Sequence, residues 1–293
     1  MTDLIEGIYT TKMELLGLPY DLIISTTTVT CCLPGIIFNV ENIGLNLNAF
    51  DEIFIGKRFG NRVVNNLISV KKLKTGKKKK RKEKKNFFNQ VSLIFRSATL
   101  MGLDPNKLSI KERNKTVNVK LFINGSIQMT GCKHLDNITK SLEILFDKLK
   151  IRTAILTDKM EFVEKPFVND IKILDIKNVK KFKIQMINTN FNILFQINRS
   201  KLFQLLLDNK IDVSFDPIIH ACVNIKYHLQ NNPTKTISIF VFESGSITIA
   251  GSNSSDEVLE AYNFINRFIL NNYMYLLTKD ITPQLIIELI KKM

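Results

Sequence analysis

Two phenylalanines have the residue type and the setting to make an unusual contact. Phe122 and Phe242 each lie near the end of a short segment in which apolar and polar residues alternate. Successive side chains of a strand point to opposite faces, so both rings are expected on the face that carries the polar neighbours. A large aromatic ring on a face that should meet water indicates that something docks there.

The two segments, residues 116–131 and 236–251, are copies of one another. Phe122 corresponds to Phe242 and Gly125 to Gly245, each 120 positions apart (242 minus 122). Each segment predicts two antiparallel strands joined by a turn and followed by a helix, which indicates an internal duplication. The positions expected to face the core are Val117, Val119, Leu121, Ile127 and Met129 in one copy and Ile237, Ile239, Val241, Ile247 and Ile249 in the other.

The duplication extends upstream. Residues 91–96 match 221–226 with an offset of 130 (221 minus 91), and residues 23–26 match 186–189 with an offset of 163 (186 minus 23). Each repeat therefore reads as strand, helix, several strands and helix, an α+β pattern. The predicted divisions are an N-terminal extension (1–21), a first repeat (22–151) with a basic insert (71–85) and a loop (98–115), a linker (152–181), a second repeat (182–270) and a C-terminal helical extension (271–293).

Finer elements follow from local patterns. The sequence predicts a helix over residues 40–50, an edge strand within 53–64 and a strand over 87–97. The first helix of the second repeat is expected at 200–207 with Ser200 as its cap, and a short amphipathic helix is expected after Thr282.

Composition limits the partners. The chain has 293 residues, 45% of them hydrophobic, and a net charge of +15 with a pI near 9.6. It can bury a sizeable core, and its charge favours an anionic partner, with nucleic acid ahead of an anionic membrane surface. Much of the excess charge lies in the lysine-rich run 71–85, which three readings fit: a solvated insert, a sliding contact to phosphates or a nuclear import signal.

Catalytic and metal-binding patterns are absent from the sequence. His134, His220 and His228 lack metal-ligand spacing, and there is no glycine-rich phosphate loop, so neither an enzyme nor a cofactor is expected. The cysteines show no C-x-x-C spacing and are predicted to be buried small residues in a reducing compartment. No signal peptide and no stretch long enough to span a membrane is expected.

The duplicated pattern resembles the core of the TATA-box-binding protein family. The best local match is F-D-P-I-I-H-A-C-V-N-I-K (215–226) followed by I-F-V-F-E-S-G-S-I-T-I-A-G, which is similar to the family's Y-x-P-x-x-F-P-G-L-I-Y-R and L-L-I-F-x-S-G-K-x-x-x-T-G. The resemblance covers roughly residues 22–270 outside the inserts and the linker. Divergence, inserts and an Ile-, Lys- and Asn-rich composition suggest a version from a large DNA virus or a protist.

The resemblance implies a saddle-shaped antiparallel sheet with helices on its convex side. Such proteins bind double-stranded A/T-rich DNA through the minor groove, wedge phenylalanines between base steps, bend the duplex and recruit initiation factors or RNA polymerase. The expected location is the nucleus or a cytoplasmic viral factory or virion. The rival interpretation is an interaction module that kept the fold and binds protein or single-stranded nucleic acid without recognising a TATA element.

The resemblance also transfers site residues. Phe122 and Phe242 match one wedge in each repeat, whereas Gln90 and His220 stand where the second wedges would be, unless Phe87 or Phe88 substitutes for Gln90. The family's first-strand asparagines fall on Leu22 and Gln185. The expected DNA-contacting set also includes Ile24, Ile187, Thr130, Thr248, Gln128, Asn124, Ser244, Arg96 and Lys226. Several of these positions lack the residue that the family has there, as Leu22 does where an asparagine stands. These differences predict a relaxed preference for the DNA sequence.

Overall fold

The computed structural model describes residues 5–9, 19–47, 51, 53–65, 87–156 and 159–278. The chain divides into two compact units. The first unit contains Met1–Tyr9 and Thr28–Lys183, and the second contains Thr10–Thr27 and Ile184–Met293. Each unit holds one copy of the duplicated hairpin. The lysine-rich run 71–85 and the helix expected after Thr282 lie outside the described residues.

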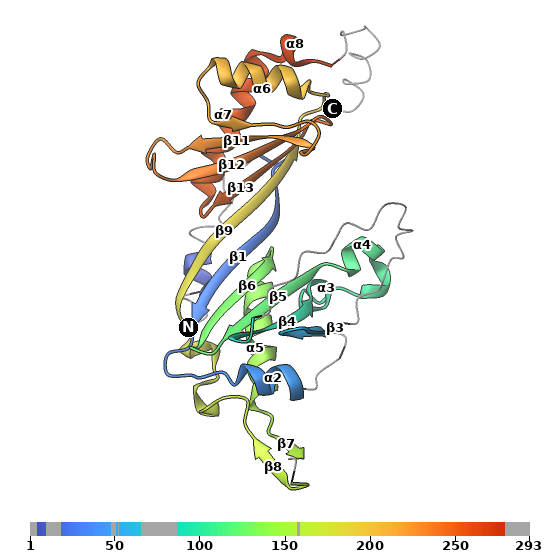
Figure 1. Cartoon of the computed structure of the whole chain (residues 1–293), viewed down its shortest axis with the longest axis vertical. Helices are drawn as coiled ribbons and strands as arrows, with labels where there is room; N and C mark the ends of the chain where they lie inside the picture. Colours follow the sequence, from blue (N-terminus) through green and yellow to red (C-terminus); the bar gives the residue numbers. More distant parts are fainter. Residues whose placement is uncertain are drawn as a thin grey trace. The chain divides into compact units, whose positions relative to one another are not determined.

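The elements of the first unit follow one another in chain order (Figure 1). They are β1 (Ile23–Cys32, of which the second half belongs to this unit), α2 (Val40–Asn46), β2 (Phe54–Phe59), β3 (Arg62–Asn65), β4 (Gln90–Arg96), α3 (Ser97–Leu100), the 3₁₀ turn η1 (Pro105–Lys107), α4 (Ile110–Arg113), β5 (Thr116–Phe122), β6 (Ser126–Cys132), α5 (Leu135–Lys150), β7 (Thr153–Leu156), β8 (Phe162–Lys165) and the 3₁₀ turns η2 (Ile171–Ile173) and η3 (Ile176–Asn178).

The second unit has the same plan with fewer additions. Its elements are β9 (Lys180–Asn192, from Ile184 onward), α6 (Arg199–Asp208), β10 (Val213–Ser214), β11 (Cys222–His228), β12 (Thr236–Phe242), β13 (Ser246–Ser252), α7 (Ser255–Asn271) and α8 (Tyr273–Leu276).

Within each unit, every strand except β7 and β8 belongs to a hydrogen-bonded sheet. In the first unit the strand order is β1-β6-β5-β4-β2-β3, and in the second it is β10-β11-β12-β13-β9-β1. The duplicated hairpins pair antiparallel with equivalent registers, since Val119 lies opposite Met129 and Ile239 opposite Ile249. Strands β7 and β8 pair with each other as a separate hairpin.

The alternation in the sequence correctly assigned the core face of each hairpin. All ten residues expected to face the core are at most 1% exposed. The long helices cover this face, because α5 packs on β5 and β6 and α7 packs on β12 and β13. Their buried stripes, such as Leu142 and Leu145 in α5, recur at helical spacing. The α+β class is therefore confirmed, and the long helix of each repeat lies on the core face of its hairpin.

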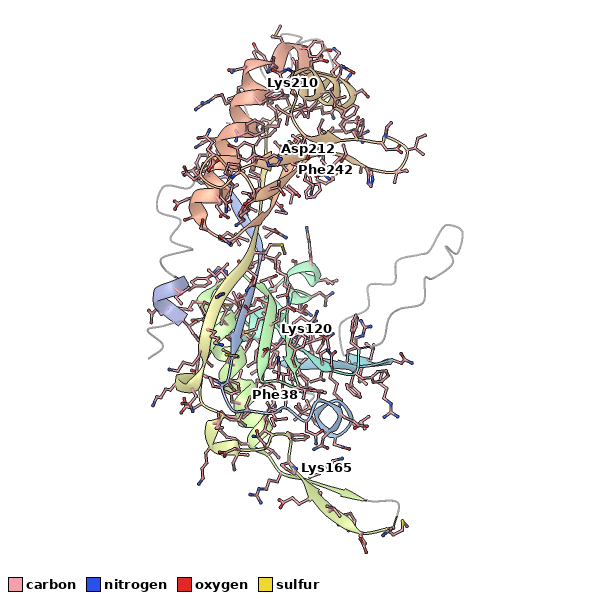
Figure 2. The ribbon with its side chains drawn as sticks, turned by 60° about the vertical axis from the view of Figure 1, so that its left-hand side comes forward. Phe38, Lys120, Lys165, Lys210, Asp212 and Phe242 are labelled. Atoms are coloured by element: carbon pink, nitrogen blue, oxygen red, sulfur yellow. The ribbon has the colours of Figure 1, made fainter. Side chains whose placement is uncertain are left out.

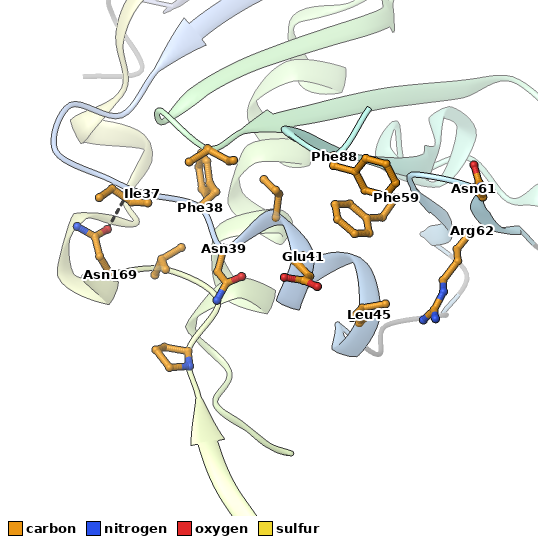
Figure 3. Close-up of a pocket in the computed structure, with 14 residues that line it drawn as sticks. Ile37, Phe38, Asn39, Glu41, Leu45, Phe59, Asn61, Arg62, Phe88 and Asn169 are labelled. Carbon is orange, nitrogen blue, oxygen red and sulfur yellow. Dashed lines mark hydrogen bonds between the residues drawn. The ribbon is translucent and has the colours of Figure 1, made fainter. Parts of the chain in front are cut away.

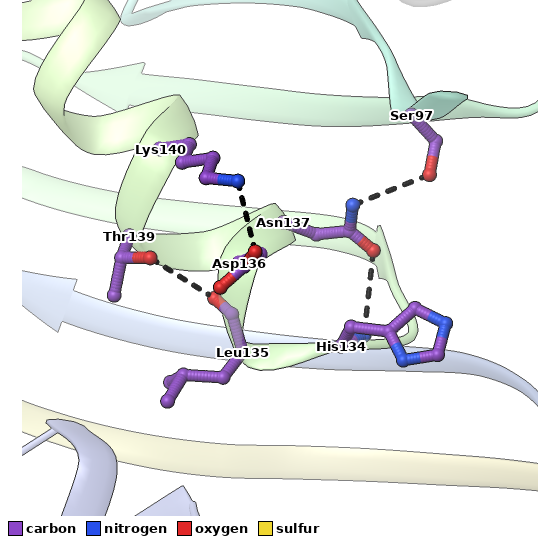
Figure 4. A network of polar contacts seen from close by, with 7 residues as sticks. All are labelled: Ser97, His134, Leu135, Asp136, Asn137, Thr139 and Lys140. Carbon is purple, nitrogen blue, oxygen red and sulfur yellow. Dashed lines mark hydrogen bonds and ion pairs between the residues drawn. The ribbon is translucent and has the colours of Figure 1, made fainter. Parts of the chain in front are cut away.

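The start of α5 is held by a buried amide (Figure 4). Asn137 is fully buried, and its Oδ1 accepts hydrogen bonds from the backbone N–H groups of Lys133 (3.1 Å) and His134 (3.3 Å). Its Nδ2 donates to Ser97 Oγ at 3.3 Å, which ties α5 to the start of α3. Asp136, in the first turn of this helix, pairs with Lys140 at 2.9 Å. These bonds satisfy donors that a helix start leaves unpaired.

Several finer predictions need correction. Residues 98–115 form α3, η1 and α4 in place of a plain loop, and the expected edge strand within 53–64 is a hairpin of β2 and β3. The cap of α6 is Asn198, whose side chain accepts from the Lys201 N–H at 3.1 Å, because the helix starts one residue before Ser200. The linker contains β7, β8 and two 3₁₀ turns.

The register of the strands also corrects the upstream match. Val91 lies opposite Leu121, and Val223 lies opposite Val241, the counterpart of Leu121. Strand β4 therefore corresponds to β11 with an offset of 132 (223 minus 91) and not 130. A slip of two residues keeps every side chain on the same face, so the apolar alternation could not reveal it.

Both hairpin turns depend on a glycine pressed against the loop that follows the first strand of the repeat. Gly125 and Gly245 both have φ of +82°. A Cβ at Gly125 would lie 2.7 Å from the Leu33 carbonyl oxygen, and one at Gly245 would collide with the carbonyl oxygens of Ile193 and Phe195. Matching backbone bonds join the turn to the loop, from Leu33 N to Gly125 O (3.1 Å) and from Ile193 N to Gly245 O (3.0 Å).

Replacing Gly245 with Ala is expected to destabilise the protein by more than the cost of a positive φ alone. That conformation costs about 1 kcal/mol or more for a residue with a Cβ, and the collision with two carbonyls adds to it. The matched control is Gly102→Ala, because Gly102 has φ of +71° but no atom within 4 Å of the place that an alanine methyl would take. Urea unfolding measures both variants, and equal losses would show that the turn is not clamped.

Candidate nucleic-acid interface

The outward face of the first unit is organised in rows across β4, β5 and β6. Gln90 lies opposite Phe122, next to the turn. The following rows are Ser92, Lys120 and Gln128, then Ile94, Asn118 and Thr130, then Arg96 with Thr116. These rows place predicted residues from three strands on one surface.

The outward face of the second unit has matching rows. Cys222 lies opposite Phe242 next to the turn, and Figure 2 labels that ring at the end of β12. The next row contains Asn224, Phe240, Thr248 and Asn190, and the row after it contains Lys226, Ser238, Ala250 and Asn188. The position of Lys120 is therefore taken by Phe240, so the second face is more aromatic and the first more cationic.

The two predicted rings hold equivalent places. Phe122 and Phe242 are both half-buried, and neither belongs to the core. In each case the carbonyl of the phenylalanine accepts a bond from the turn glycine, Gly125 or Gly245, at 3.0 Å. Because these glycines are clamped to a neighbouring loop, both rings project from a fixed strand end.

Exposed apolar residues precede the strand that faces each ring. Phe87 and Phe88, just before β4, are 51% and 63% exposed, and Ile218 and Ile219, before β11, are 94% and 71% exposed. With the corrected offset of 132, Phe88 corresponds to His220 and Phe87 to Ile219 (219 minus 87). The alternative in which Phe88 takes the place assigned to Gln90 therefore agrees with the register. Ile218 and Ile219 were missed, although two adjacent apolar residues after Pro217 are a visible signal.

Asparagines on the outward faces carry unpaired oxygens. Among the described residues, the Oδ1 atoms of Asn118, Asn188 and Asn224 are buried and have no hydrogen-bond partner. An unpaired buried acceptor costs about 1–3 kcal/mol, which favours occupation by a ligand with polar edges. Each of these side chains also carries an NH₂ group that can donate. None of the three was among the predicted site residues.

The basic residues are used in different ways. Lys226 Nζ donates to Ser238 Oγ at 2.7 Å within its own row. Arg96 Nη1 donates to the Arg113 carbonyl at 3.1 Å and so helps to hold the segment of α3 and α4. Lys120 is half-buried in the centre of the first face, and Arg58 of β2 lies in the same row, on the far side of Ser92. The first face thus has positive charge at its centre as well as at its edge.

The remaining predicted residues are placed less uniformly. Ile187 is 2% exposed and faces the core, opposite Ser252, so the prediction that it lines the outward face is wrong. Leu22 is also buried. The error has a different cause from the register shift, because the alternation changes phase within β9. Phe182 and Ile184 are buried before the change and Ile187, Thr189 and Phe191 after it, whereas Asn188, Asn190 and Asn192 lie outward. Ile24 is half-buried, and Gln185, Asn124, Ser244 and His220 are exposed.

Arg199, at the start of α6, fastens the turn of the second unit. Its Nη2 pairs with Glu243 Oε2 at 2.7 Å, and its Nη1 donates to the Ala221 carbonyl at 2.8 Å. The guanidinium also lies over the ring of Phe215, 5.4 Å from its centroid. One side chain thereby joins the residue after Phe242 to the residue before Cys222. Nothing in the local sequence pattern marks this arginine, so its role was not predicted.

Arg199→Met is expected to loosen the turn without unfolding the unit. Losing the ion pair and the bond to Ala221 should cost about 1 kcal/mol, since Glu243 is more than half exposed and water screens the pair. Amide hydrogen exchange should become several-fold faster at Ile197 and Gly245, whose N–H groups bond to the carbonyls of Glu243 and Phe242. Arg267→Met on α7 is the control, and equal exchange in both variants would refute the role of Arg199.

Two other kinds of site find no support within the described ranges. No group of three or more His, Cys, Asp or Glu side chains is gathered there in a way that could hold a metal ion. Burial raises the pKa of Cys31 and of Cys132 to about 12, so these thiols stay protonated and unreactive. Cys32 and Cys222 are only half-buried, which corrects the expectation that all four are buried. None of the described helices combines the length and hydropathy needed to cross a bilayer.

Among known proteins, a viral one resembles the chain over most of its length. This protein of Acanthamoeba polyphaga mimivirus, named "TATA-box-binding protein-like", is 32% identical over 268 residues, covering 87% of this chain and 66% of the relative's length. The solved structure of Methanococcus jannaschii TBP matches with a TM-score of 0.47 and 14% identity, covering 86% of this chain and 99% of that one. No family model matches the chain. The viral match agrees with the duplicated unit and its motifs. The chain is therefore similar, over most of its own length, to a TATA-box-binding-protein-like protein, and it spans about two thirds of that relative's length.

Proposed function

We propose that the chain is a transcription initiation factor that binds A/T-rich double-stranded DNA in the minor groove, bends it and recruits initiation factors or RNA polymerase. The observation that carries this proposal is the equivalent placement of Phe122 and Phe242, each beside a clamped glycine turn on the sheet face opposite the long helix of its repeat. A ring that is to separate stacked bases must be held rigidly, because unstacking a step costs a few kcal/mol.

The neighbouring residues support the same role. Phe87 in the first unit and Ile218 and Ile219 in the second are exposed apolar residues that precede the strand opposite each ring, whereas Phe88 packs edge to face on Phe59. Apolar wedges are most effective at flexible pyrimidine–purine steps such as TA, so part of the preference would come from DNA deformability. The outward asparagines, with Gln128, Thr130 and Thr248, supply donors for the groove floor.

The rival function is an interaction module whose sheet binds a protein segment or single-stranded nucleic acid. Two observations favour it: both rings are only half-exposed, and Arg96, assigned to phosphate, is already bonded to the Arg113 carbonyl. The two functions predict different results when the rings are removed. Only insertion of the rings into a duplex produces a bend in the DNA that depends on them.

The double variant Phe122→Ala, Phe242→Ala is expected to bind an A/T-rich duplex at least about tenfold more weakly and to bend it less, because the wedges are lost. A circular-permutation mobility assay measures the bend, and a titration of the same duplex measures affinity. Both side chains are outside the core, so the melting temperature should change little.

The control for this experiment is Leu207→Ala, because Leu207 on α6 is 43% exposed and lies off the sheet. Its bend and affinity should equal those of the wild type. If the double variant also bends the duplex as the wild type does, the wedge proposal fails. Retention of single-strand binding in both proteins would then support the interaction module.

Exchange of A·T for inosine·cytosine pairs should leave binding nearly unchanged, whereas exchange for G·C pairs should weaken it at least about tenfold. Inosine lacks the guanine N2 amino group, so an I·C pair resembles A·T in the minor groove and G·C in the major groove. Asn188→Ala should reduce the discrimination against G·C several-fold, while Asn232→Ala, in the exposed loop between β11 and β12, should not. A loss of binding on I·C duplexes would place the readout in the major groove and contradict the proposal.

A further inference from the structure

The linker between the repeats carries a projecting β-hairpin that neither repeat uses. Strands β7 and β8 pair from Thr153 with Lys165 to Leu156 with Phe162. Figure 2 shows the hairpin extending beyond Lys165, away from Phe38 and Lys120 of the same unit. All four residues of β8 are exposed, and Phe162 and Met160 at its tip are 79% and 77% exposed.

The base of the hairpin is firmly anchored to the first unit. Asn42 of α2 donates from Nδ2 to the carbonyls of Lys165 and Pro166, both at 3.0 Å. The Asn39 N–H donates to the Phe167 carbonyl at 2.9 Å, and Phe167 and Val168 are buried. The hairpin is therefore held in a defined direction at its base.

The hairpin itself lacks what normally stabilises two strands. It pairs with no third strand among the described residues, so the outer backbone edges of both β7 and β8 stay open there. An isolated two-stranded hairpin is at best marginally stable in water, and open edges are templates for a further strand. The structure thus presents backbone donors and acceptors together with apolar side chains.

The charge of this segment points to a protein and not to nucleic acid. Residues 151–166 contain three basic and three acidic residues, a net charge of zero (3 minus 3), in a chain whose net charge is +15. Arg152 is already paired with Glu164 at 3.1 Å. A surface that tracks phosphates needs a positive excess, which this hairpin lacks.

A hollow continues the apolar surface at the base of the hairpin (Figure 3). It encloses about 840 Å³ and is lined by Pro166 and Val168 after β8, by Leu45 of α2, and by Phe59 and Phe88, whose rings meet edge to face at 5.7 Å. Asn169, hydrogen-bonded to the Ile37 N–H at 2.7 Å, lies at its rim. A strand lying along the hairpin would lead into this hollow, which has room for a large side chain.

We propose that the β7–β8 hairpin and this hollow form a docking site for an extended, apolar segment of a partner protein. The segment adds to an open edge of the hairpin as a third strand and places a large apolar side chain in the hollow. This site goes beyond DNA binding, since it is built from the linker hairpin, α2 and β2. Of the residues put forward for DNA binding it includes only Phe88, whose ring packs on Phe59.

The test uses the full chain as bait for a display library of random linear peptides of about twelve residues, enough to pair along the hairpin and reach the hollow. Enriched sequences, made as free peptides, are expected to alternate apolar with polar residues and to carry a large apolar residue near one end. Titration calorimetry should show at least about tenfold weaker binding to Phe162→Ser and to Leu45→Gln. Hydrogen exchange should show that the bound peptide protects backbone amides of residues 153–156 or 162–165.

Ile110→Ser is the matched control, since Ile110 is 53% exposed on α4 of the same unit, and it should bind the peptides as the wild type does. No enrichment, or equal binding to Phe162→Ser, would overturn the proposal. Two other results would also overturn it: self-association that Phe162→Ser abolishes would identify a second copy as the occupant, and weaker duplex binding by this variant would identify nucleic acid. Phe162 is largely exposed, so misfolding does not explain any of these outcomes.

Discussion

The constraint on which the structure depends is that each duplicated hairpin has only one face for its helix. Burial of the ten inward residues under α5 and α7 contributes about 1.5–3 kcal/mol for each large apolar side chain. The alternation that builds this core sends the other residues of the same strands to the opposite face. Whatever the protein binds on that face is positioned by core packing on the other, and the glycine turns fix where each row ends.

The duplication preserved the framework more strictly than the surface. Gly125 and Gly245 share the same φ and the same contact with a neighbouring loop, and Phe122 and Phe242 hold the same row. Around them the two faces diverged, with Lys120 in one where Phe240 stands in the other. A framework position is constrained by contacts on several sides, whereas an outward residue is constrained only by its ligand. If the sheet binds a duplex as proposed, the two units would contact it differently, the first through charge and the second through apolar surface.

The linker hairpin shows how a new surface can be added without disturbing the repeats. Its base is joined to α2 and its N-cap through Asn42 and Asn39, whereas all four residues of β8 are exposed. Exposed residues such as Phe162 can change to suit a binding partner, because their substitution lowers the stability of the fold only slightly. If the sheet binds DNA, the hairpin leaves that surface free and gives a second partner a separate place to dock.

The sequence by itself determined the class of the fold, the duplication, the core face of both hairpins and the positions of Phe122 and Phe242. These features follow from apolar residues that recur every two residues in strands and every 3.6 residues in helices, and from glycines that recur in both copies. Such signals can be recognised within a short stretch of sequence. Only the tertiary structure decided the pairing of β4 with β5, and with it the equivalence of Phe88 and His220, because a slip of two residues leaves the alternation intact. It likewise decided that Ile187 faces the core, that Asn188 and Asn224 face outward, and that Arg199 reaches Glu243 from 44 positions away. Such facts depend on which segments meet in space, and no spacing along a single chain encodes them.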